Sequence, residues 1–547
     1  MTTIPAMTIV SGPLLPLVAL VWPLLLGAAI ALPRLRGHAL LVLPLAPVPA
    51  LAAALTGLSG VTEVPPLLLG TVLHAGRDGA LLFGVTAAIW LAAGVAGSRS
   101  LTGLRRPAVF AGFWCLTFAG NLGVMLAADV ATFYVAFAAV SLAAYVLVVA
   151  KGTDQALRAG RIYLTLAVLG EAALLLGFML AVAEAGSLAV DDVRRVLAAQ
   201  PLAAGLLALG FAVKAGVMPL HIWLPLAHPA APVPASAVLS GAIVKAGLIG
   251  VILFLPHYPV LTVLGLVTLI GGAVLGLTQT RVKAMLAYST VSQMGLVMAL
   301  AGTGGATAAT FYAAHHGLAK AALFLSVGLV AAVASRGRLV ALALVGVAAA
   351  SVAGVPLTGG AVTKAAAKAA LGPAAELVVT LSGVTTTLLL MRVLTGLHGT
   401  RAGSGAGPVL WLPVAGLVGG ALALPWVLGP GWSGLPGDYA LHLSAIWSAG
   451  WPVGAGLLIA ALAWRFGLAL PRLPEGDLAP LAERWAFRLR QAFSAIPPPP
   501  LPGWDIARPW QGLMRLGARA EPVLSRLPVS GGLLVALALG LALLLSG

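Results

Sequence analysis

Long apolar runs follow one another along almost the whole of this chain. A membrane-spanning helix requires ~20 predominantly apolar residues, and about sixteen runs approach or exceed that length. They lie at residues 7–32, 37–57, 80–98, 107–127, 129–150, 162–186, 201–218, 235–255, 259–278, 284–301, 306–333, 338–355, 374–397, 408–428, 445–466 and 529–546. Because so many apolar segments cannot all be buried in a water-soluble fold, we predict an all-α polytopic membrane protein.

The charged residues are too few to build a water-facing surface. Only 8% of the 547 residues are charged, 60% are apolar, and the mean hydropathy is +1.05, whereas soluble proteins carry about 25% charged residues. The net charge of +16 is spread too thinly to form a basic groove, so we expect no nucleic-acid partner. The single cysteine, Cys115, excludes an internal disulfide and a cysteine zinc site. We expect no metal and no cofactor.

Arginine and lysine collect in alternate loops, and this alternation predicts the topology. The basic loops are 33–38, 99–106, 151–161, 279–283, 334–338 and 392–407, and the opposite loops include 58–79, 302–305 and 429–444. The 187–200 loop mixes two aspartates with two arginines. The positive-inside rule places the basic loops in the cytoplasm. We therefore expect a multi-pass protein of the bacterial cytoplasmic membrane, with both termini outside and the first run retained rather than cleaved.

One charged block, residues 467–528, precedes the last apolar run. Within it, Ala482–Phe493 carries apolar and basic residues on opposite stripes of a helix, and Pro497–Pro500 must end that helix. We predict an amphipathic arm that lies along the membrane or on a neighbouring subunit, followed by a final helix over 529–547. A solvated linker is the alternative.

The lysines are placed differently from the arginines. There are seven lysines against 24 arginines, and five of them lie inside or against apolar runs: Lys214, Lys245, Lys320, Lys364 and Lys368. A buried lysine can release its proton, whereas arginine stays charged. Because an ionisable side chain in the bilayer core is costly unless it is paired or hydrated, such residues are functional candidates.

Two apolar runs are interrupted by glycine and proline, each beside a lysine. The first interruption follows GFAVKAGVMP at 210–219, and the second is AGVPLTGGAVTK at 353–364. Two interrupted helices in one chain indicate an inverted-repeat transport site. The other buried ionisable residues are Glu171, the one acid deep within a run, and four histidines, His221, His228, His315 and His316.

Four stretches resemble a known family. GFAVKAGVMPLHIWLPLAHPAAPVPASAVLSGAIVKAG, TRVKAMLAYSTVSQMG, HHGLAKAALF and GVPLTGGAVTK are similar to the signature segments of the antiporter-like proton-channel family. This family includes the large membrane subunits of respiratory complex I, Mrp-type sodium/proton antiporter subunits and hydrogenase-linked relatives. The resemblance covers roughly residues 107–400, in order.

The resemblance implies a core of about 14 helices with two inverted five-helix repeats. The implied division is N-terminal helices over 1–106, a first repeat over 107–255 broken near 214–234, a second repeat over 256–400 broken near 353–368, and further core helices over 401–466. It also implies a mid-membrane proton relay through Lys214, Lys245, His316, Lys320 and Lys364, with Lys364 beside the far exit. Other membrane or soluble subunits, contacted partly through the arm, would be the partners.

The sequence departs from the family in its first acid. The family carries a glutamate that pairs with the first lysine, but Ala138 stands at that position, and Leu226 replaces a usual aspartate. We predict that the pair has moved to Glu171 and Lys214, which makes Glu171 part of the relay. Alternatively, Glu171 faces a partner subunit or is a lone protonated acid.

Some of these residues also have plain structural explanations. Lys320 could pair with a helix carbonyl, Lys368 could reach the membrane surface, His315 could serve in packing, and His221 and His228 could cap the broken-helix loop.

Three functions stay open on the sequence alone. The first is a proton-translocating subunit of a redox-driven complex, such as an NADH:quinone oxidoreductase-like translocase, or a sodium/proton antiporter. The second is the proton channel of a two-component inorganic-carbon uptake system with a soluble zinc partner. The third is a structural relative that no longer conducts. The chain carries no recognisable nucleotide loop, redox ligand set or hydride-binding fingerprint, so a partner must drive or use any ion flux.

Overall fold

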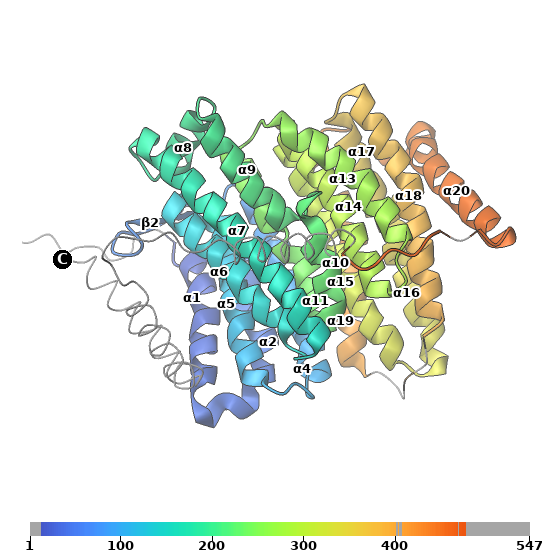
Figure 1. Ribbon diagram of the computed structural model, residues 1–547, viewed down its shortest axis with the longest axis horizontal. Coiled ribbons are helices and arrows are strands. Elements are labelled where there is room, and N and C mark those ends of the chain that lie inside the picture. Colours follow the sequence, from blue (N-terminus) through green and yellow to red (C-terminus); the bar gives the residue numbers. More distant parts are fainter. Residues whose placement is uncertain (1–12, 401–402, 404–406, 469, 477–547) are drawn as a thin grey trace, which may run out of the picture.

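The computed structural model describes residues 13–400, 403, 407–468 and 470–476 (Figure 1). Within this part of the chain, 14 helices are long and apolar enough to cross a membrane, and Leu15–Ala31 is a shorter apolar helix. The prediction of an all-α polytopic membrane protein is therefore confirmed. The arm predicted at 467–528 lies outside the described residues beyond 476, as does all of the final helix at 529–547.

The N-terminal part comprises four α-helices, a 3-10 helix and a hairpin. Its helices are α1 (Leu15–Ala31), η1 (Pro33–Leu41), α2 (Val42–Leu45), α3 (Val48–Thr56) and α4 (Arg77–Ser100). Strands β1 (Val61–Val64) and β2 (Thr71–His74) pair antiparallel, with Val61 opposite His74 and Val64 opposite Thr71. The hairpin occupies the loop between two apolar runs, where its alternating burial lets one face cover the end of the bundle.

The region predicted as the first repeat contains a broken fourth member. Its elements are α5 (Pro107–Leu126), α6 (Val130–Val149), α7 (Asp154–Ala185), α8 (Val190–Leu197), α9 (Pro201–Ala215), η2 (Leu220–Ile222), α10 (Trp223–Ala230), α11 (Val233–Val238), η3 (Leu239–Ile243) and α12 (Lys245–Phe254). Here α9 and α10 are the two halves of the broken helix, and η3 is a single π-helical turn between α11 and α12.

The region predicted as the second repeat is also broken at its fourth member. Its helices are α13 (Pro259–Leu277), α14 (Val282–Gly302), α15 (Ala306–Ala332), α16 (Ser335–Ala353), α17 (Gly359–Ala369) and α18 (Pro373–His398). Two further helices and a 3-10 turn complete the described chain: α19 (Pro408–Trp432), η4 (Tyr439–Leu441) and α20 (Leu443–Arg465). The inverted symmetry itself and the domain boundaries stay predictions.

Both breaks are built in the same way. Helix α9 ends at a left-handed Gly216 (φ +73°) and α16 at a left-handed Gly354 (φ +88°). Only glycine adopts this conformation without a steric cost, which is why it ends helices so often. A proline follows each glycine within three residues, at Pro219 and Pro356, and prevents the helix from resuming at once. The sequence prediction of two broken helices is confirmed.

The order of helices along the chain sets their order across the bundle. Figure 1 shows α1, α5, α6 and α7 at one end and α16, α18 and α20 at the other, with α13, α14 and α15 between them. Helix α19 is an exception, because it returns to the middle and contacts α4 and α15. The buried core is continuous over these helices, with α14 the most enclosed, followed by α15 and the span of α11 to α12.

The basic loops meet where the helices end, at one end of the bundle along the helix axes. The Arg338 guanidinium donates to the carbonyl oxygens of Leu397 and His398, at 2.9 and 2.8 Å, and so joins loop 334–338 to loop 392–407. The Arg392 guanidinium likewise donates to the carbonyl of Gln279 at 3.1 Å. Three loops that the alternation assigns to one side of the membrane are therefore in contact.

The loops poor in arginine and lysine meet at the opposite end. Arg77 donates to the carbonyl of Gly431 and lies 4.3 Å from the centroid of the Trp432 ring. Loop 302–305 lines a surface pocket together with Trp432. At each end, loops that the alternation assigns to the same side contact each other, and the side that faces the cytoplasm stays a prediction.

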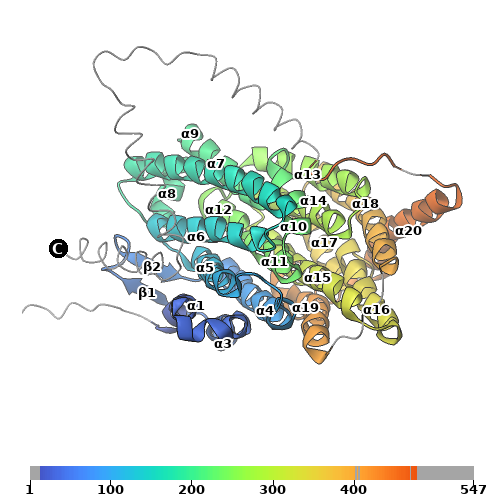
Figure 2. The ribbon, with the colours of Figure 1, turned by 60° about the horizontal axis from the view of Figure 1, so that its bottom comes forward.

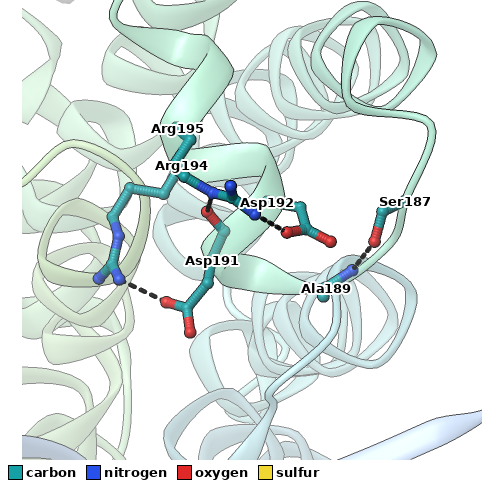
Figure 3. Close-up of polar contacts among 6 residues, drawn as sticks. All are labelled: Ser187, Ala189, Asp191, Asp192, Arg194 and Arg195. Carbon is teal, nitrogen blue, oxygen red and sulfur yellow. Dashed lines mark hydrogen bonds and ion pairs between the residues drawn. The ribbon is translucent and has the colours of Figure 1, made fainter.

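The mixed loop at 187–200 forms the short helix α8, in which the charges compensate one another (Figure 3). Arg194 pairs with Asp191 and Arg195 pairs with Asp192, each three residues apart on one helix face. A hydrogen bond from the Ser187 hydroxyl, together with Arg195, holds the pKa of the Asp192 carboxyl below its usual range. The two arginines therefore add no net positive charge to this loop.

The chain beyond α20 runs back across the bundle (Figure 2). It reaches Arg281, whose Nη1 donates to Glu475 Oε2 at 3.2 Å. Burial raises the pKa of Glu475, and the nearby Arg281 opposes that rise. The beginning of the predicted arm thus contacts a loop of its own chain at the basic end of the bundle.

Candidate functional site

The residues predicted as the relay are all buried in the bundle. Between 0% and 7% of each side chain is exposed: Glu171, Lys214, Lys245, His316, Lys320 and Lys364. They come from five helices, α7, α9, α12, α15 and α17. Burying a charge or a strong donor is costly unless it finds a partner, so the contacts of each lysine matter.

Lys245 and His316 are brought into direct contact. Lys245 Nζ lies 3.1 Å from His316 Nδ1 and donates to the Ser240 carbonyl oxygen at 2.6 Å. The Ser240 carbonyl belongs to the π-helical turn η3 immediately before α12. Such turns disturb the regular backbone ladder and recur at functional sites. The predicted neighbours of the central relay are therefore within hydrogen-bond distance of each other.

Lys320 lies one helical turn beyond His316 on α15. Its Nζ donates to the Leu286 carbonyl oxygen of α14 at 2.7 Å and lies 5.5 Å from the centroid of the Phe324 ring. The helix carbonyl that the sequence left open as an alternative partner is thus present. Because Lys320 and His316 share one face of α15, the lysine still lies next to the central cluster.

Glu171 and Lys214 line one small cavity. Its walls also include Phe137, Ser141 and Tyr163, and its volume is about 10 Å³, room for on the order of one water molecule. The two side chains interact electrostatically. Neither Lys214 Nζ nor Glu171 Oε2 has a hydrogen-bond partner within the described chain. The structure therefore places the acid and the lysine at one cavity without joining them directly.

Lys364 is held at the second break. Its Nζ donates to the carbonyl oxygen of Ala353, the last residue of α16, at 2.7 Å. A methyl group built on Gly354 would lie 2.9 Å from Lys364 Cδ, so the glycine leaves room for the lysine side chain. The broken helix thus supplies both a carbonyl partner and the space for Lys364.

His315 has a specific polar partner, although the sequence suggested only packing. Its Nε2 lies 2.8 Å from Ser351 Oγ of α16. A methyl group built on Gly360, one turn before Lys364, would lie 3.1 Å from His315 Cε1. The adjacent histidines therefore point different ways, His316 toward α12 and His315 toward the second break. The sequence signal for this second polar contact was the pair of adjacent histidines inside one apolar run.

A polar network continues from the central cluster across α14 to α18. Tyr312 stacks on His316 with 6.4 Å between ring centroids, and its hydroxyl donates a hydrogen bond to Gln293 Oε1. Gln293 Nε2 donates in turn to Thr386 Oγ1 at 3.2 Å. The role of Gln293 in joining three helices is visible only in the packing.

The two histidines of the first break are enclosed. His228 stacks on Phe324 with 4.4 Å between ring centroids, and the His221 ring lies 6.0 Å from that of Tyr288. Both side chains are fully buried. Among the described residues, no group of three or more His, Cys, Asp or Glu side chains is arranged to hold a metal ion.

The middle of the chain matches a known family. Residues 127–389 match the family described as NADH:quinone oxidoreductase/Mrp antiporter, transmembrane. This span runs from the start of α6 through most of α18 and contains every predicted relay residue. The chain is therefore an antiporter-like membrane protein, as its four signature stretches indicated.

Curated relatives of this antiporter-like protein are named as parts of a hydrogenase and of quinone oxidoreductases. Hydrogenase-4 component B of Escherichia coli is 32% identical over 262 residues, 42% of this chain and 39% of that protein. NADH-quinone oxidoreductase subunit N of Geotalea uraniireducens is 33% identical over 295 residues, 50% of this chain and 58% of that protein. NAD(P)H-quinone oxidoreductase chain 4 2 of Microcystis aeruginosa is 32% identical over 268 residues, 45% and 48% of the two chains. The matches thus span less than two thirds of these relatives.

Solved structures show the same fold. The Mrp complex from Dietzia sp. DQ12-45-1b contains a chain with a TM-score of 0.70 and 24% identity, covering 93% of this chain and 63% of that one. The archaeal membrane-bound sulfane sulfur reductase contains one with a TM-score of 0.63 and 20% identity, covering 82% and 98%. At these identities the likeness establishes the fold of the antiporter-like chain.

Proposed function

We propose that this antiporter-like protein translocates protons across the membrane through a buried lysine and histidine relay, as a membrane subunit of a larger complex. The observation that carries the proposal is the direct contact of Lys245 with His316, 3.1 Å apart inside the bundle. Lysine and imidazole nitrogens at this distance can share a proton, because either can act as the donor or the acceptor after a change of charge state.

The contacts support one order for the proposed relay. Glu171 and Lys214 occupy one end at their shared cavity, Lys245 with His316 and Lys320 form the centre, and Lys364 lies at the second break. Each of the last three lysines donates to a backbone carbonyl. A carbonyl accepts from an ammonium group but does not neutralise it, so the lysine keeps its ability to release a proton.

The gaps between these stations require water. Polar cavities in protein interiors hold ordered water that bridges otherwise unsatisfied groups. Lys214 Nζ and Glu171 Oε2 are such groups. We infer that water at the Glu171 cavity connects the two side chains, and that neighbouring positive charges bias each other's occupancy through Coulomb repulsion.

The energy for transport must come from a partner. Relatives of this chain are named as components of hydrogenase and quinone oxidoreductase complexes, and one structural neighbour belongs to an Mrp complex. We therefore favour a subunit of such an assembly. Proton/cation antiport and a channel for an inorganic-carbon uptake system use the same relay, and a non-conducting relative would lack flux altogether.

Proton flux into liposomes tests the proposal. The full chain, purified with any partner subunits that accompany it, is reconstituted with a pH-sensitive dye inside the vesicles. We expect flux for the wild type, and a fall of roughly tenfold or more for Lys245→Ala and Lys245→Arg, since ~1.4 kcal/mol added to a barrier slows a step tenfold. Lys151→Gln, at an exposed loop lysine, is the control. Equal flux in wild type and Lys245→Ala would refute the relay.

A further inference from the structure

A polar cavity lies beside Lys364, the last lysine of the proposed relay. It has a volume of about 160 Å³, enough for several water molecules, and its walls come from α16, α17, α18, η4 and α20. Its polar lining consists of Lys364, Lys368, Glu376, Thr380, Tyr439 and Ser448. A cavity of this size with convergent charged groups differs from the tight packing around the other lysines.

Three ionisable groups along this cavity are increasingly exposed. Lys364 is buried, Lys368 is half-buried and Glu376 is exposed. Lys364 and Lys368 are four residues apart on α17, so their side chains lie on one face of the helix. Glu376 stands in the first turn of α18 and interacts electrostatically with Lys368. The cavity thus runs from the end of the relay to the surface with a titratable group at each stage.

Lys368 has two partners that would hold it at intermediate depth. Its Nζ lies 3.4 Å from Ser448 Oγ of α20, and the Glu376 carboxylate attracts it from the surface side. Neither contact is a close ion pair, so Lys368 is not locked to a single acid, which suits a group that exchanges protons.

We propose that Lys368, positioned by Glu376 and Ser448, is the group that passes protons between Lys364 and the aqueous phase, with this cavity as the water-filled vestibule in which it does so. The inference rests on the proposed proton translocation. A proton leaves the Lys364 ammonium, passes through water to neutral Lys368, and departs from Lys368 to bulk water beside Glu376. Once the relay has returned a proton to Lys364, like-charge repulsion between the two ammonium groups, four residues apart, drives the proton on Lys368 outward.

The first test asks whether the cavity contains water. Cys115 is fully buried, so we expect the wild type not to react with a membrane-impermeant thiol reagent. Thr380 lines the cavity, whereas its neighbour Leu381 does not and is 45% exposed on the apolar surface of the bundle. We expect Thr380→Cys to react and Leu381→Cys, the matched control, to stay unmodified in proteoliposomes. An unreactive Thr380→Cys would overturn the vestibule.

The second test asks whether Lys368 carries protons or only a charge. Glutamine removes the charge, and arginine keeps the charge but cannot release a proton. We expect both Lys368→Gln and Lys368→Arg to lower proton flux several-fold, and Glu376→Gln to lower it less. Flux at the wild-type level in Lys368→Arg would overturn the exchange role, whether or not Lys368→Gln is slow.

Two reference proteins separate this inference from the proposed function. If the wild type conducts, Lys245→Ala does not, and both Lys368 variants match the wild type, then the exchange role of Lys368 fails while the relay stands. If the wild type shows no flux, or if Lys245→Ala equals it, the relay fails and the vestibule fails with it. Size-exclusion profiles of the variants confirm that each has folded.

Discussion

At the scale of single residues, the acid at the start of the relay is the most unusual feature. Ala138 lies next to Phe137, whose ring is 5.8 Å from Lys214 Nζ, so α6 faces the lysine but offers it no carboxylate. Glu171 of α7 reaches the same cavity from a different direction. Because a cavity rather than a direct contact separates Glu171 from Lys214, their coupling depends on what fills that space.

A swap of the acid between the two helices tests this arrangement. We expect Glu171→Gln to reduce proton flux roughly tenfold, because Lys214 loses the only carboxylate at its cavity among the described residues. Adding Ala138→Glu to that variant should restore part of the flux, since it returns a carboxylate to the side of the cavity formed by α6. Dye-monitored flux in liposomes measures both effects. If Glu171→Gln matched the wild type, Glu171 would have no part in the relay.

The lysines of the site were predictable from sequence, whereas their partners were not. A lysine inside an apolar run stands out in any sequence because burial of its charge is costly. The contact of Lys245 with Ser240 depends on a π-helical turn that carries no proline. The different directions of His315 and His316 depend on which helices surround α15. Such features arise from packing between distant segments, which local patterns do not encode.

At the scale of elements, the second break depends on close approach of two helices. A methyl group built on Gly360 of α17 would lie 1.6 Å from the Ser351 carbonyl oxygen of α16. No neighbouring side chain can relieve that clash, because the contact is with backbone. The two halves of the broken helix can therefore pack this closely only because Gly360 has no side chain.

Replacing this glycine should loosen the break. We expect Gly360→Ala to destabilise the protein by about 1–3 kcal/mol, the usual cost of overpacking a core, and to displace Lys364. Gly346→Ala on α16 is the matched control, since nothing lies within 4 Å of a methyl group there and alanine favours the helix. Thermal unfolding in detergent compares them. Equal melting temperatures for the two variants would contradict the tight contact.

The segment after α20 offers a pH-dependent contact outside the membrane-spanning helices. Burial raises the pKa of Glu475 above its ordinary 4.5, and Arg281 opposes this rise. A carboxyl group with a raised pKa binds its proton more tightly in the docked state than in the free state. Docking is therefore strongest in acid and weakens as the pH rises through the raised pKa.

Removing the arginine should make that dependence steeper. In Arg281→Gln, the half-buried carboxylate loses its partner, so we expect the segment to undock at neutral pH and to dock again in acid. Glu475→Gln should dock equally at both. A thiol probe at a Leu226→Cys substitution, a position buried against Gly476 of the segment, with the buried Cys115 silent, reports whether the segment is docked. An Arg281→Gln segment that is equally protected at both pH values would contradict the ion pair.

At the scale of the whole molecule, the fold was the most predictable feature. Within the described chain, the apolar runs correspond to the helices observed, because a helix is the only open structure that satisfies its backbone in a bilayer. The breaks at Gly216 and Gly354 were marked by glycine and proline in the sequence. The return of α19 to the middle of the bundle was not predictable, since an apolar helix reveals little about which neighbour it will contact.

The gathering of the loops predicts the orientation of the entire molecule. Arg338, Arg392 and their loops meet at one end, and the loops that contain Arg77 and Gly431 meet at the other. Lys and Arg are retained on the cytoplasmic side of a membrane during insertion. We therefore expect the end that carries Arg338 to face the cytoplasm.

Single cysteines at the two ends test this orientation in intact cells. Glu63→Cys and Asp438→Cys, at exposed positions of the loops poor in basic residues, should react with an impermeant thiol reagent. Arg105→Cys and Arg336→Cys, in the basic loops, should react only after the membrane is permeabilised. Because both members of each pair lie at one end of the bundle, they must behave alike. Reaction of Arg336→Cys in intact cells would reverse the orientation, and disagreement within a pair would show that the two ends are not on opposite sides of the membrane.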